Sequence, residues 1–360
     1  MNLYYCSLYY KNDHVTGANK RFDEIGIRLL GSNTFNLVCI VTTGNRPVWC
    51  PKEKCIEICG FKSKFQRLRS WVSLSFLLWK LPKGIIYNDF QPKPTFFALK
   101  RHKHFQLIHD LRNFDKFKRG GLGVLSAFFQ KTQLKYSQNV VSVSNYTTEL
   151  VESFCSKSRE SIITSYNGIS GSYEGGDKNR EIDLLYIATY EERKNHIRLL
   201  EALSGIKFKK LNIVFVGSDL GLKNQVIDMA NSISASVGHS FKFLDQISEE
   251  LLIETYKNSK IFCSPSLYEG FGMPLIEAYK YGCLVVCSDI KVFREVTLNE
   301  AVYFEPTDVD DIKSTLESSF LNYDGLLNSE HAKKVTNYFS WDAITKRLIK
   351  DLNSNEFFAS

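Results

Sequence analysis

The sequence predicts an α/β protein built from two domains, each with a parallel β-sheet covered by helices on both faces. Short apolar runs of strand length alternate with amphipathic helical segments along the chain, which is the pattern of βαβ units. A chain of 360 residues, of which 44% are hydrophobic, exceeds the size at which one core usually divides into two. Residues 171–183 (GSYEGGDKNREID) are rich in glycine and polar residues, as interdomain linkers are. We therefore expect one domain over residues 1–171 and a second over residues 172–340.

In the first domain, the expected strands alternate with helices. After the first strand, a loop containing Gly17 precedes a helix, which is the order of a Rossmann opening, although the dinucleotide motif GxGxxG is missing. Ser144 or Asn145 can cap the last helix of this domain. Strands are expected at residues 2–10, 37–41, 55–58, 84–87, 105–109 and 140–143. Helices are expected at residues 20–30, at 61–81 as one helix or two, and at 122–136.

The second domain continues the alternation. Asn195 is expected to cap one helix, and Ser248, followed by two glutamates, marks the start of another. Pro274 suits the first position of a helix of about eight residues, and Gly282 suits the left-handed residue that ends it. Strands are expected at residues 184–188, 212–216, 241–244, 260–263 and 283–287, and helices at 196–203, after Ser218, at 249–256 and from Pro274.

Charge is distributed unevenly along the chain. Residues 1–170 carry 25 Lys and Arg against 11 Asp and Glu, and residues 171–360 carry 21 against 28. The net charge is therefore +14 in the first half and −7 in the second. A basic half suits nucleic acid, an anionic membrane surface or a phosphorylated substrate, and charge alone does not choose among them. The basic, aromatic segment 61–81, with Trp71 and Trp79, suits either a membrane surface or a crossover helix packed on the sheet.

Cysteine usage and the N-terminus predict a cytosolic protein. The nine cysteines are odd in number and mostly lie in apolar runs, as core residues in a reducing compartment do. Cys50, Cys55 and Cys59 lie closer together, but they form no CxxC pair and no histidine is near, so no metal site is predicted. The first residues lack a basic signal-peptide region, and no apolar run approaches the roughly 20 residues that span a bilayer. Membrane contact is expected only at the surface.

The segment 264–289 (SPSLYEGFGMPLIEAYKYGCLVVCSD) contains the residues most suggestive of a function. The free N–H groups at the helix start make an anion site, which Gly270 and Gly272 allow a phosphate to approach closely. Glu269 and Glu277 flank this site, and because carboxylates repel phosphate, we expect them to accept hydrogen bonds from hydroxyls. Phosphate with several hydroxyls describes a sugar nucleotide. The alternative is two solvated carboxylates around an ordinary helix cap.

Two further groups of residues lie where parallel strands end, which is where α/β sheets bind ligands. Arg193 and Lys194 follow the first strand of the second domain and can neutralise a pyrophosphate. Gly217 and Ser218 end the next strand and are expected to face the same ligand. In the first domain, His109 follows a strand and can exchange protons near neutral pH.

The run EGFGMP at residues 269–274, followed by GCLVVCSD at 282–289, resembles the donor site of glycosyltransferase family 4. Its members are retaining enzymes that use nucleotide sugars. The resemblance implies the GT-B fold, in which two Rossmann-like parallel-sheet domains face each other across a cleft. It also implies that the final segment, about residues 341–360, crosses back to the first domain as a helix. The first domain would then bind the acceptor and the second the donor.

The resemblance implies roles for individual residues of this donor site. Glu269 would contact the transferred sugar near the reacting carbon, as a nucleophile or as a stabiliser of positive charge, and Glu277 would hold the ribose. A front-face mechanism without a covalent intermediate is equally open. The backbones of Phe271, Gly272 and Met273 would approach the sugar and the phosphates.

Three shorter segments also resemble the family. RKN at residues 193–195 resembles the segment whose cations, here Arg193 and Lys194, stabilise the leaving diphosphate. QLIHDLRN resembles the HD motif on the acceptor side, which implies cleft roles for His109 and Asp110. Gly17 lies where members often carry a glycine-rich acceptor loop, although a second glycine is missing.

The sequence therefore predicts a hexosyltransferase of bacterial surface polysaccharide synthesis, of the O-antigen or capsule type. The favoured donor is GDP-mannose, with UDP-hexoses still open, and the acceptor is a glycan or a lipid-diphosphate-linked glycan. No cofactor and no metal ion are expected, because the two cations and the helix start can stabilise the leaving group. The alternatives are a sugar-nucleotide epimerase of the same fold and a non-catalytic binder of nucleic acid or anionic membrane. No nucleic-acid partner is expected, because no recognisable RNA- or DNA-binding motif is present.

Overall fold

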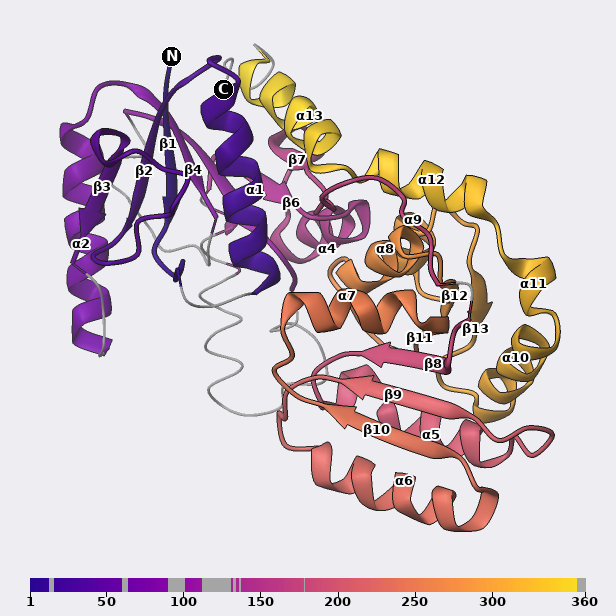
Figure 1. The fold of residues 1–360 in the computed structure, drawn as a ribbon. Helices are drawn as coiled ribbons and strands as arrows, with labels where there is room; N and C mark the ends of the chain where they lie inside the picture. The colour runs from indigo at the N-terminus through magenta and orange to yellow at the C-terminus, as the bar shows by residue number, and fades with distance from the viewer. Residues whose placement is uncertain are drawn as a thin grey trace. The chain divides into compact units, whose positions relative to one another are not determined.

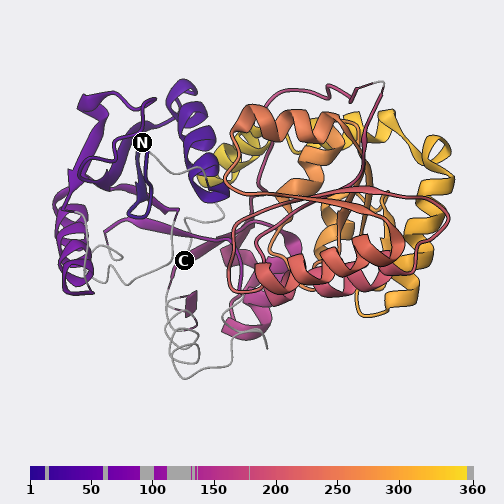
Figure 2. The ribbon, with the colours of Figure 1, turned by 60° about the horizontal axis from the view of Figure 1, so that its bottom comes forward.

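The computed structural model describes residues 1–12, 16–59, 64–89, 101–111, 131, 134–135, 137–177 and 179–354, without the side chains of residues 64–68, 70 and 71. The side chain of Trp71 and most of the helix expected at 122–136 therefore lie outside what the structure describes. The chain divides into two compact units, one formed by Met1–Gly168 with Trp341–Ser360 and the other by Ile169–Ser340 (Figures 1 and 2). The sequence placed this boundary after residue 171, with the final helix assigned to the first domain.

In its described residues, the first unit contains a seven-stranded parallel sheet of order β3-β2-β1-β4-β5-β6-β7. The order reverses between β1 and β4. The strands are β1 (Asn2–Ser7), β2 (Asn36–Thr42), β3 (Cys55–Ile58), β4 (Gly84–Asn88), β5 (Lys103–Ile108), β6 (Asn139–Ser142) and β7 (Ile162–Thr164). The helices are α1 (Gly17–Gly31), η1 (Lys52–Lys54), α2 (Lys64–Lys80), α4 (Asn145–Cys155), η3 (Arg159–Ser161) and α13 (Trp341–Asn353).

The second unit contains a six-stranded parallel sheet of order β10-β9-β8-β11-β12-β13 in its described residues. Because the order reverses between β8 and β11, right-handed crossovers place α5 and α6 on one face and α7 and α8 on the other (Figure 1). The strands are β8 (Ile182–Ile187), β9 (Asn212–Val216), β10 (Ser240–Leu244), β11 (Ser259–Ser264), β12 (Leu284–Ser288) and β13 (Val302–Phe304). The helices are η4 (Glu192–Lys194), α5 (His196–Ser204), α6 (Lys223–Val237), α7 (Glu249–Lys257), α8 (Met273–Lys280), α9 (Lys291–Val296), α10 (Val309–Leu321), α11 (Tyr323–Leu326) and α12 (Ser329–Tyr338).

The first strand and the first helix differ most from their predicted bounds. β1 ends at Ser7 rather than at residue 10, and α1 begins at Gly17 rather than at residue 20. The Thr16 hydroxyl accepts a hydrogen bond of 3.2 Å from the backbone N–H of Asn19, so this threonine caps the helix earlier than expected. Ser144 caps α4 in the same way, through the backbone N–H of Thr147.

The basic segment after β3 forms the single helix α2, which packs on the sheet as a crossover helix. Leu74 and Leu78 are buried and join a core cluster with strand residues of β1, β2, β3 and β4. On the same helix, Val72, Phe76 and Trp79 are 62%, 55% and 49% exposed. The helix therefore has one buried apolar face and one exposed apolar face.

The unit Ile169–Ser340, which includes the residues expected to form a linker, has its own core. Buried side chains of β8, β9, β11 and β12 pack against α5, α6 and α10. Within the described ranges, none of the helices combines the length and the apolar character required to cross a lipid bilayer.

Candidate active site

The strand order of the second unit brings two distant segments of the chain together. β8 and β11 are neighbours and run parallel, so their carboxyl ends lie at the same edge of the sheet, where the strand order reverses. Ligands of doubly wound sheets bind at such reversal points. η4 follows β8 and carries Arg193 and Lys194, and the loop after β11 carries Glu269.

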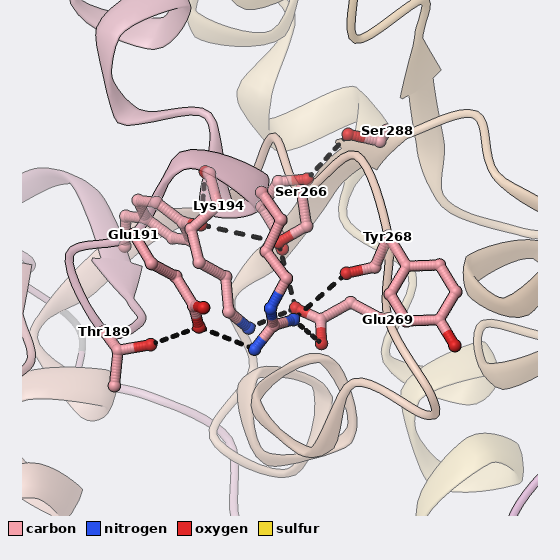
Figure 3. Close-up of polar contacts among 10 residues, drawn as sticks. Thr189, Glu191, Lys194, Ser266, Tyr268, Glu269 and Ser288 are labelled. Atoms are coloured by element: carbon pink, nitrogen blue, oxygen red, sulfur yellow. Dashed lines mark hydrogen bonds and ion pairs between the residues drawn. The ribbon is translucent and has the colours of Figure 1, made fainter. Parts of the chain in front are cut away.

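The side chains of these segments form one ion-pair network (Figure 3). Arg193 Nη1 lies 3.1 Å from Glu269 Oε2, and Arg193 Nη2 lies 2.7 Å from Glu191 Oε1. Lys194 Nζ forms an ion pair with Glu269 Oε1. The Ser266 hydroxyl donates a hydrogen bond of 3.0 Å to the same oxygen. The structure thus brings together the three residues that the sequence predicted to act on the sugar and the diphosphate.

Burial and charge act in opposite directions on Glu269. Its side chain is 13% exposed, and burial raises the pKa of its carboxyl group, but the charges of Lys194 and Arg193 outweigh burial and lower the pKa below its ordinary value. Burial also disfavours the charged form of Arg193, which lowers its pKa. The charges of Glu269 and Glu191 outweigh burial, so the pKa of Arg193 lies above its ordinary value. Glu269 is therefore an ionised carboxylate at neutral pH, held between two cations.

Backbone hydrogen bonds fix the two segments against each other. The N–H of Leu267 donates to the carbonyl of Arg193 at 2.8 Å, and the Tyr186 hydroxyl donates to the carbonyl of Lys194 at 2.7 Å. Asn195 occupies the N-cap position of α5, but its side chain makes no capping bond, so that prediction was wrong. Its backbone is left-handed (φ 60°), and its amide instead donates to the carbonyls of Pro265 and Pro306 at 3.0 and 2.8 Å. Asn195 therefore anchors the loop that carries Glu269.

The helix after this loop begins at Met273, one residue before the predicted start at Pro274. Gly272 precedes it with φ +100°, and a Cβ there would lie 2.9 Å from the Phe293 ring, so both the backbone and the space require glycine. The ring of Phe271 is buried and packs edge-on against another aromatic ring. The ring of Phe271 is therefore part of the core of this unit.

Glu277 lies one turn into α8. It accepts a hydrogen bond of 2.9 Å from the hydroxyl of Tyr256, which lies on α7. This contact orients one carboxylate oxygen of Glu277. Gly282 has φ +68°, as expected for the left-handed residue after this helix.

Gly217 and Ser218 follow β9, next to the end of β8. A Cβ on Gly217 would lie 1.9 Å from the carbonyl oxygen of Ala188, so only glycine allows the strand ends to approach. The carbonyl of Ser218 accepts the N–H of Tyr190 at 3.0 Å. These contacts hold the segment from which Glu191 reaches Arg193.

Three predicted residues lie in the first unit. His109 lies at the carboxyl end of β5, as predicted, although the strand ends at Ile108 rather than at residue 109. Its Nε2 lies 3.8 Å from Oδ1 of Asp89, which follows β4. Asp110 is the next residue and is half-buried. Gly17 is the first residue of α1 rather than part of a loop, and a Cβ there would meet nothing within 4 Å, so the described structure gives no steric reason for glycine.

Asp89 is buried, and Arg21 Nε lies 4.0 Å from the same Oδ1. Burial raises the pKa of Asp89 to about 8, although the charge of Arg21 opposes this shift. Arg21 is buried too, and its guanidinium donates to the carbonyl of Tyr166 at 2.6 Å and to the hydroxyl of Ser165 at 3.0 Å. His109 therefore lies at the carboxyl edge of the first sheet beside a buried carboxyl group.

Residues 174–338 match the family model described as "Glycosyl transferases group 1". This segment is a group 1 glycosyl transferase domain. The serotype-specific mannosyltransferase WbdA of Escherichia coli is 28% identical over 170 residues, which are 47% of this chain and 20% of that protein. The O-antigen chain mannosyltransferase RfbU of Salmonella typhimurium is 28% identical over 223 residues, 59% of each chain. The chain thus spans between one fifth and three fifths of the length of these relatives.

Solved structures resemble the glycosyl transferase domain together with the first unit. A glycosyltransferase from Rickettsia africae superposes with a TM-score of 0.73 at 17% identity, over 100% of this chain and 99% of that one. Anabaena HepE, solved in complex with UDP-glucose, gives a TM-score of 0.72 at 13% identity, over 98% and 99%. With two Rossmann-like parallel-sheet units, the fold is of the GT-B class, as the sequence predicted.

Sequence reasoning missed several residues that support the predicted ones. Within the glycosyl transferase domain these are Glu191, Ser266 and Tyr256, and in the first unit Asp89. Two signals were available. A glutamate two residues before Arg193 is a natural counterion, and a serine three residues before Glu269 can donate to it within one turn. Tyr256 and Asp89 meet their partners only through the tertiary fold.

Proposed function

We propose that the chain is a retaining glycosyltransferase that moves a hexose from a nucleoside diphosphate sugar to a glycan or lipid-linked glycan acceptor. The observation that supports this most directly is the fixed network of Arg193, Lys194 and an ionised, largely buried Glu269 at the reversal point of the second sheet. The network places two cations next to a carboxylate. The cations can stabilise a diphosphate leaving group, and the carboxylate can stabilise positive charge that develops at the anomeric carbon.

In the proposed reaction, Arg193, Lys194 and the start of α8 stabilise the diphosphate as its bond to the sugar breaks. Glu269 faces the anomeric carbon, as a nucleophile or as a stabiliser of positive charge. Glu277, oriented by Tyr256, accepts hydrogen bonds from the ribose. The mechanism calls for no metal ion or other cofactor, because these side chains and the helix start carry the charge that the leaving group requires.

GDP-mannose is the favoured donor, and UDP-hexoses are the second choice. Relatives named mannosyltransferases, WbdA and RfbU, support mannose. Anabaena HepE, solved with UDP-glucose, supports a UDP-sugar on the same fold. Ser218 and Gly217 are proposed to face the nucleotide or the sugar of this donor.

The first unit is proposed to hold the acceptor, with His109 and Asp110 hydrogen-bonding its hydroxyls. Asp89 is buried next to His109 and would position the imidazole. Surface-polysaccharide assembly, of the O-antigen or capsule type, is the proposed pathway. It is supported by RfbU and by CapH, a capsular polysaccharide biosynthesis glycosyltransferase of Staphylococcus aureus that is 27% identical over 206 residues.

A lipid-linked acceptor would place the enzyme on the cytoplasmic face of a membrane. The exposed apolar face of α2 supports this proposal, since Phe76 and Trp79 are exposed there and the Lys80 cation lies with its Nζ 4.2 Å from the Phe76 ring centroid. Co-sedimentation with vesicles should increase with anionic lipid content and fall in the double variant Phe76→Ser, Trp79→Ser. Val48→Ser is the control, since Val48 is 95% exposed and lies outside α2. Binding that ignores both lipid charge and the double substitution would refute membrane contact through α2.

Incubation with nucleotide sugars and candidate acceptors tests the reaction itself. We expect a product heavier than the acceptor by one hexose residue, with the anomeric configuration of the donor, and a strongly reduced rate for Glu269→Gln. A product of unchanged mass from the sugar nucleotide would indicate an epimerase instead. An inverted anomeric centre would refute the retaining mechanism.

A further inference from the structure

Three cysteines that are scattered in the sequence converge in the first unit, away from the residues discussed above. Cys39 lies on β2, Cys55 begins β3, and the two are register partners of this parallel strand pair. Cys50 reaches them from the loop between the strands. The sulfur atoms of all three lie within 4.8 Å of one another.

The loop geometry holds Cys50 in this position. Its N–H donates to the carbonyl of Pro47 at 3.0 Å, and its own carbonyl accepts from Arg46 Nη1 at 2.6 Å. η1 then brings the chain directly into Cys55. Cys39 is 0% exposed and Cys50 is 1% exposed, whereas Cys55 is half-buried, so Cys55 is the member of the cluster with the most solvent contact.

The spacing of the sulfur atoms suits a thiophilic cation. A Zn–S bond of about 2.3 Å in tetrahedral geometry separates two thiolates by roughly 3.8 Å. Sulfur atoms already within 4.8 Å of one another therefore need to move by only about 1 Å to share one ion. In the part of the chain that the structure describes, this is the one group of three or more Cys, His, Asp or Glu ligand atoms gathered at such a spacing.

We propose that Cys39, Cys50 and Cys55 form a three-thiolate site for a divalent d¹⁰ cation of the Zn²⁺ type, with water from the side of Cys55 as the fourth ligand. Binding displaces the thiol protons to solvent and replaces weak thiol contacts, such as that of Cys50 Sγ with the carbonyl of Lys54 at 3.6 Å. Among the strands that the structure describes, β3 lies at the edge of its sheet. The ion would therefore join an edge strand, its neighbour and the loop between them, which is a structural role independent of glycosyl transfer.

The test uses the whole chain, reduced and freed of metal, with Co²⁺ as a spectroscopic probe. One equivalent should produce thiolate-to-cobalt charge transfer and the visible bands of tetrahedral Co²⁺, and Zn²⁺ should remove both. Cys55→Ser should weaken binding by more than about 100-fold, because loss of even an outer-shell partner costs 10–100-fold. Cys59→Ser is the matched control: Cys59 is exposed, lies four residues further along and is outside the cluster. It should bind as the wild type does.

A second readout needs no variant. With Zn²⁺ bound, the three cluster cysteines of the wild type should be protected from alkylation while Cys59 is labelled equally with and without the ion. The proposal is overturned if the wild type gives no charge-transfer band, if Cys55→Ser binds like Cys59→Ser, or if protection does not depend on Zn²⁺. A disulfide between two of the three, trapped by acid and alkylation at cell lysis, would overturn it as well.

Discussion

Replacing Lys194 with alanine removes one of the two cations that hold Glu269, while leaving the rest of the network in place. Glu269 keeps Arg193 Nη1 at 3.1 Å and the Ser266 hydroxyl at 3.0 Å. The backbone contact from Tyr186 goes to the carbonyl of residue 194 and survives the substitution. Because the Glu269 carboxylate keeps a cation and a hydrogen-bond donor, the free energy of unfolding should fall by less than the roughly 3–5 kcal/mol lost when a buried ion pair is broken completely. We expect about 1.5–3 kcal/mol, as for one hydrogen bond to a charged group.

The effect on turnover should be larger than this stability change explains. If Lys194 stabilises the leaving diphosphate, its loss removes a preorganised charge contact, which lowers kcat by about 10²–10³, or about 2.7–4 kcal/mol. The assay is the initial rate of sugar transfer at saturating donor, well below the melting temperature, divided by the folded fraction measured by circular dichroism. Lys194→Arg should recover part of the rate, because it restores the charge.

Lys260→Ala is the matched control. Asp183 is buried at the start of β8, and it pairs with both Lys260 Nζ at 2.9 Å and Lys209 Nζ at 2.7 Å. Lys260→Ala therefore also removes one of two cations from a buried carboxylate, but at the amino end of the sheet, away from the candidate site. Its stability loss should be similar and its kcat unchanged. If Lys194→Ala keeps the wild-type kcat, or if Lys260→Ala loses as much, the proposed role of Lys194 is wrong.

Three other predictions follow from the same structure. Tyr256→Phe removes the hydrogen bond to Glu277, so the donor nucleotide should raise the melting temperature by less than in the wild type, while the unliganded protein stays folded. An unchanged thermal shift would refute the orienting role of Tyr256. Gly272→Ala should lower the free energy of unfolding by more than about 1 kcal/mol, because φ is +100° and an aromatic ring lies 2.9 Å from the new Cβ, whereas Gly325→Ala, with nothing within 4 Å, should not. Asp89 has a folded pKa of about 8, above its unfolded value of about 4, so folding favours its protonated form and stability should fall as pH rises through this window. Asp89→Asn should abolish that part of the pH dependence in denaturant titrations, and an unchanged slope would contradict the raised pKa.

The sequence predicted most of the elements because the signals for them are local. β3 and β9 have the predicted bounds, since each is a short run rich in β-branched residues that a glycine closely follows. Ser248 caps α7 as predicted, through the N–H of Leu251. β7 and β13 were missed because three residues are too few to show a period. Their pairing depends on a neighbouring strand that supplies the hydrogen bonds.

The same distinction applies to the candidate site. Glu269 and Gly272 could be identified because one contiguous run contains them, and Arg193 because it follows a strand. The role of Asn195 was predicted wrongly because a capping residue and a loop anchor have the same chemistry, and only the left-handed backbone decides between them. The cysteine cluster was missed for a related reason. Its residues come from two strands and a loop, so their proximity depends on strand register rather than on spacing in the sequence.

The ion-pair network also bears on how the proposed enzyme would change charge during its reaction. Without a donor, Glu269 is the counterion of both Arg193 and Lys194, and Glu191 pairs with the other nitrogen of the Arg193 guanidinium, so two carboxylates balance two cations. In the proposed reaction, an incoming diphosphate competes for the same N–H groups and draws positive charge away from Glu269. Glu269 is then left close to the anomeric carbon with part of its charge uncompensated. In the transition state, the positive charge that develops at the anomeric carbon balances the charge of Glu269. Binding of the diphosphate would therefore leave Glu269 free to stabilise this positive charge as the bond between the sugar and the diphosphate breaks.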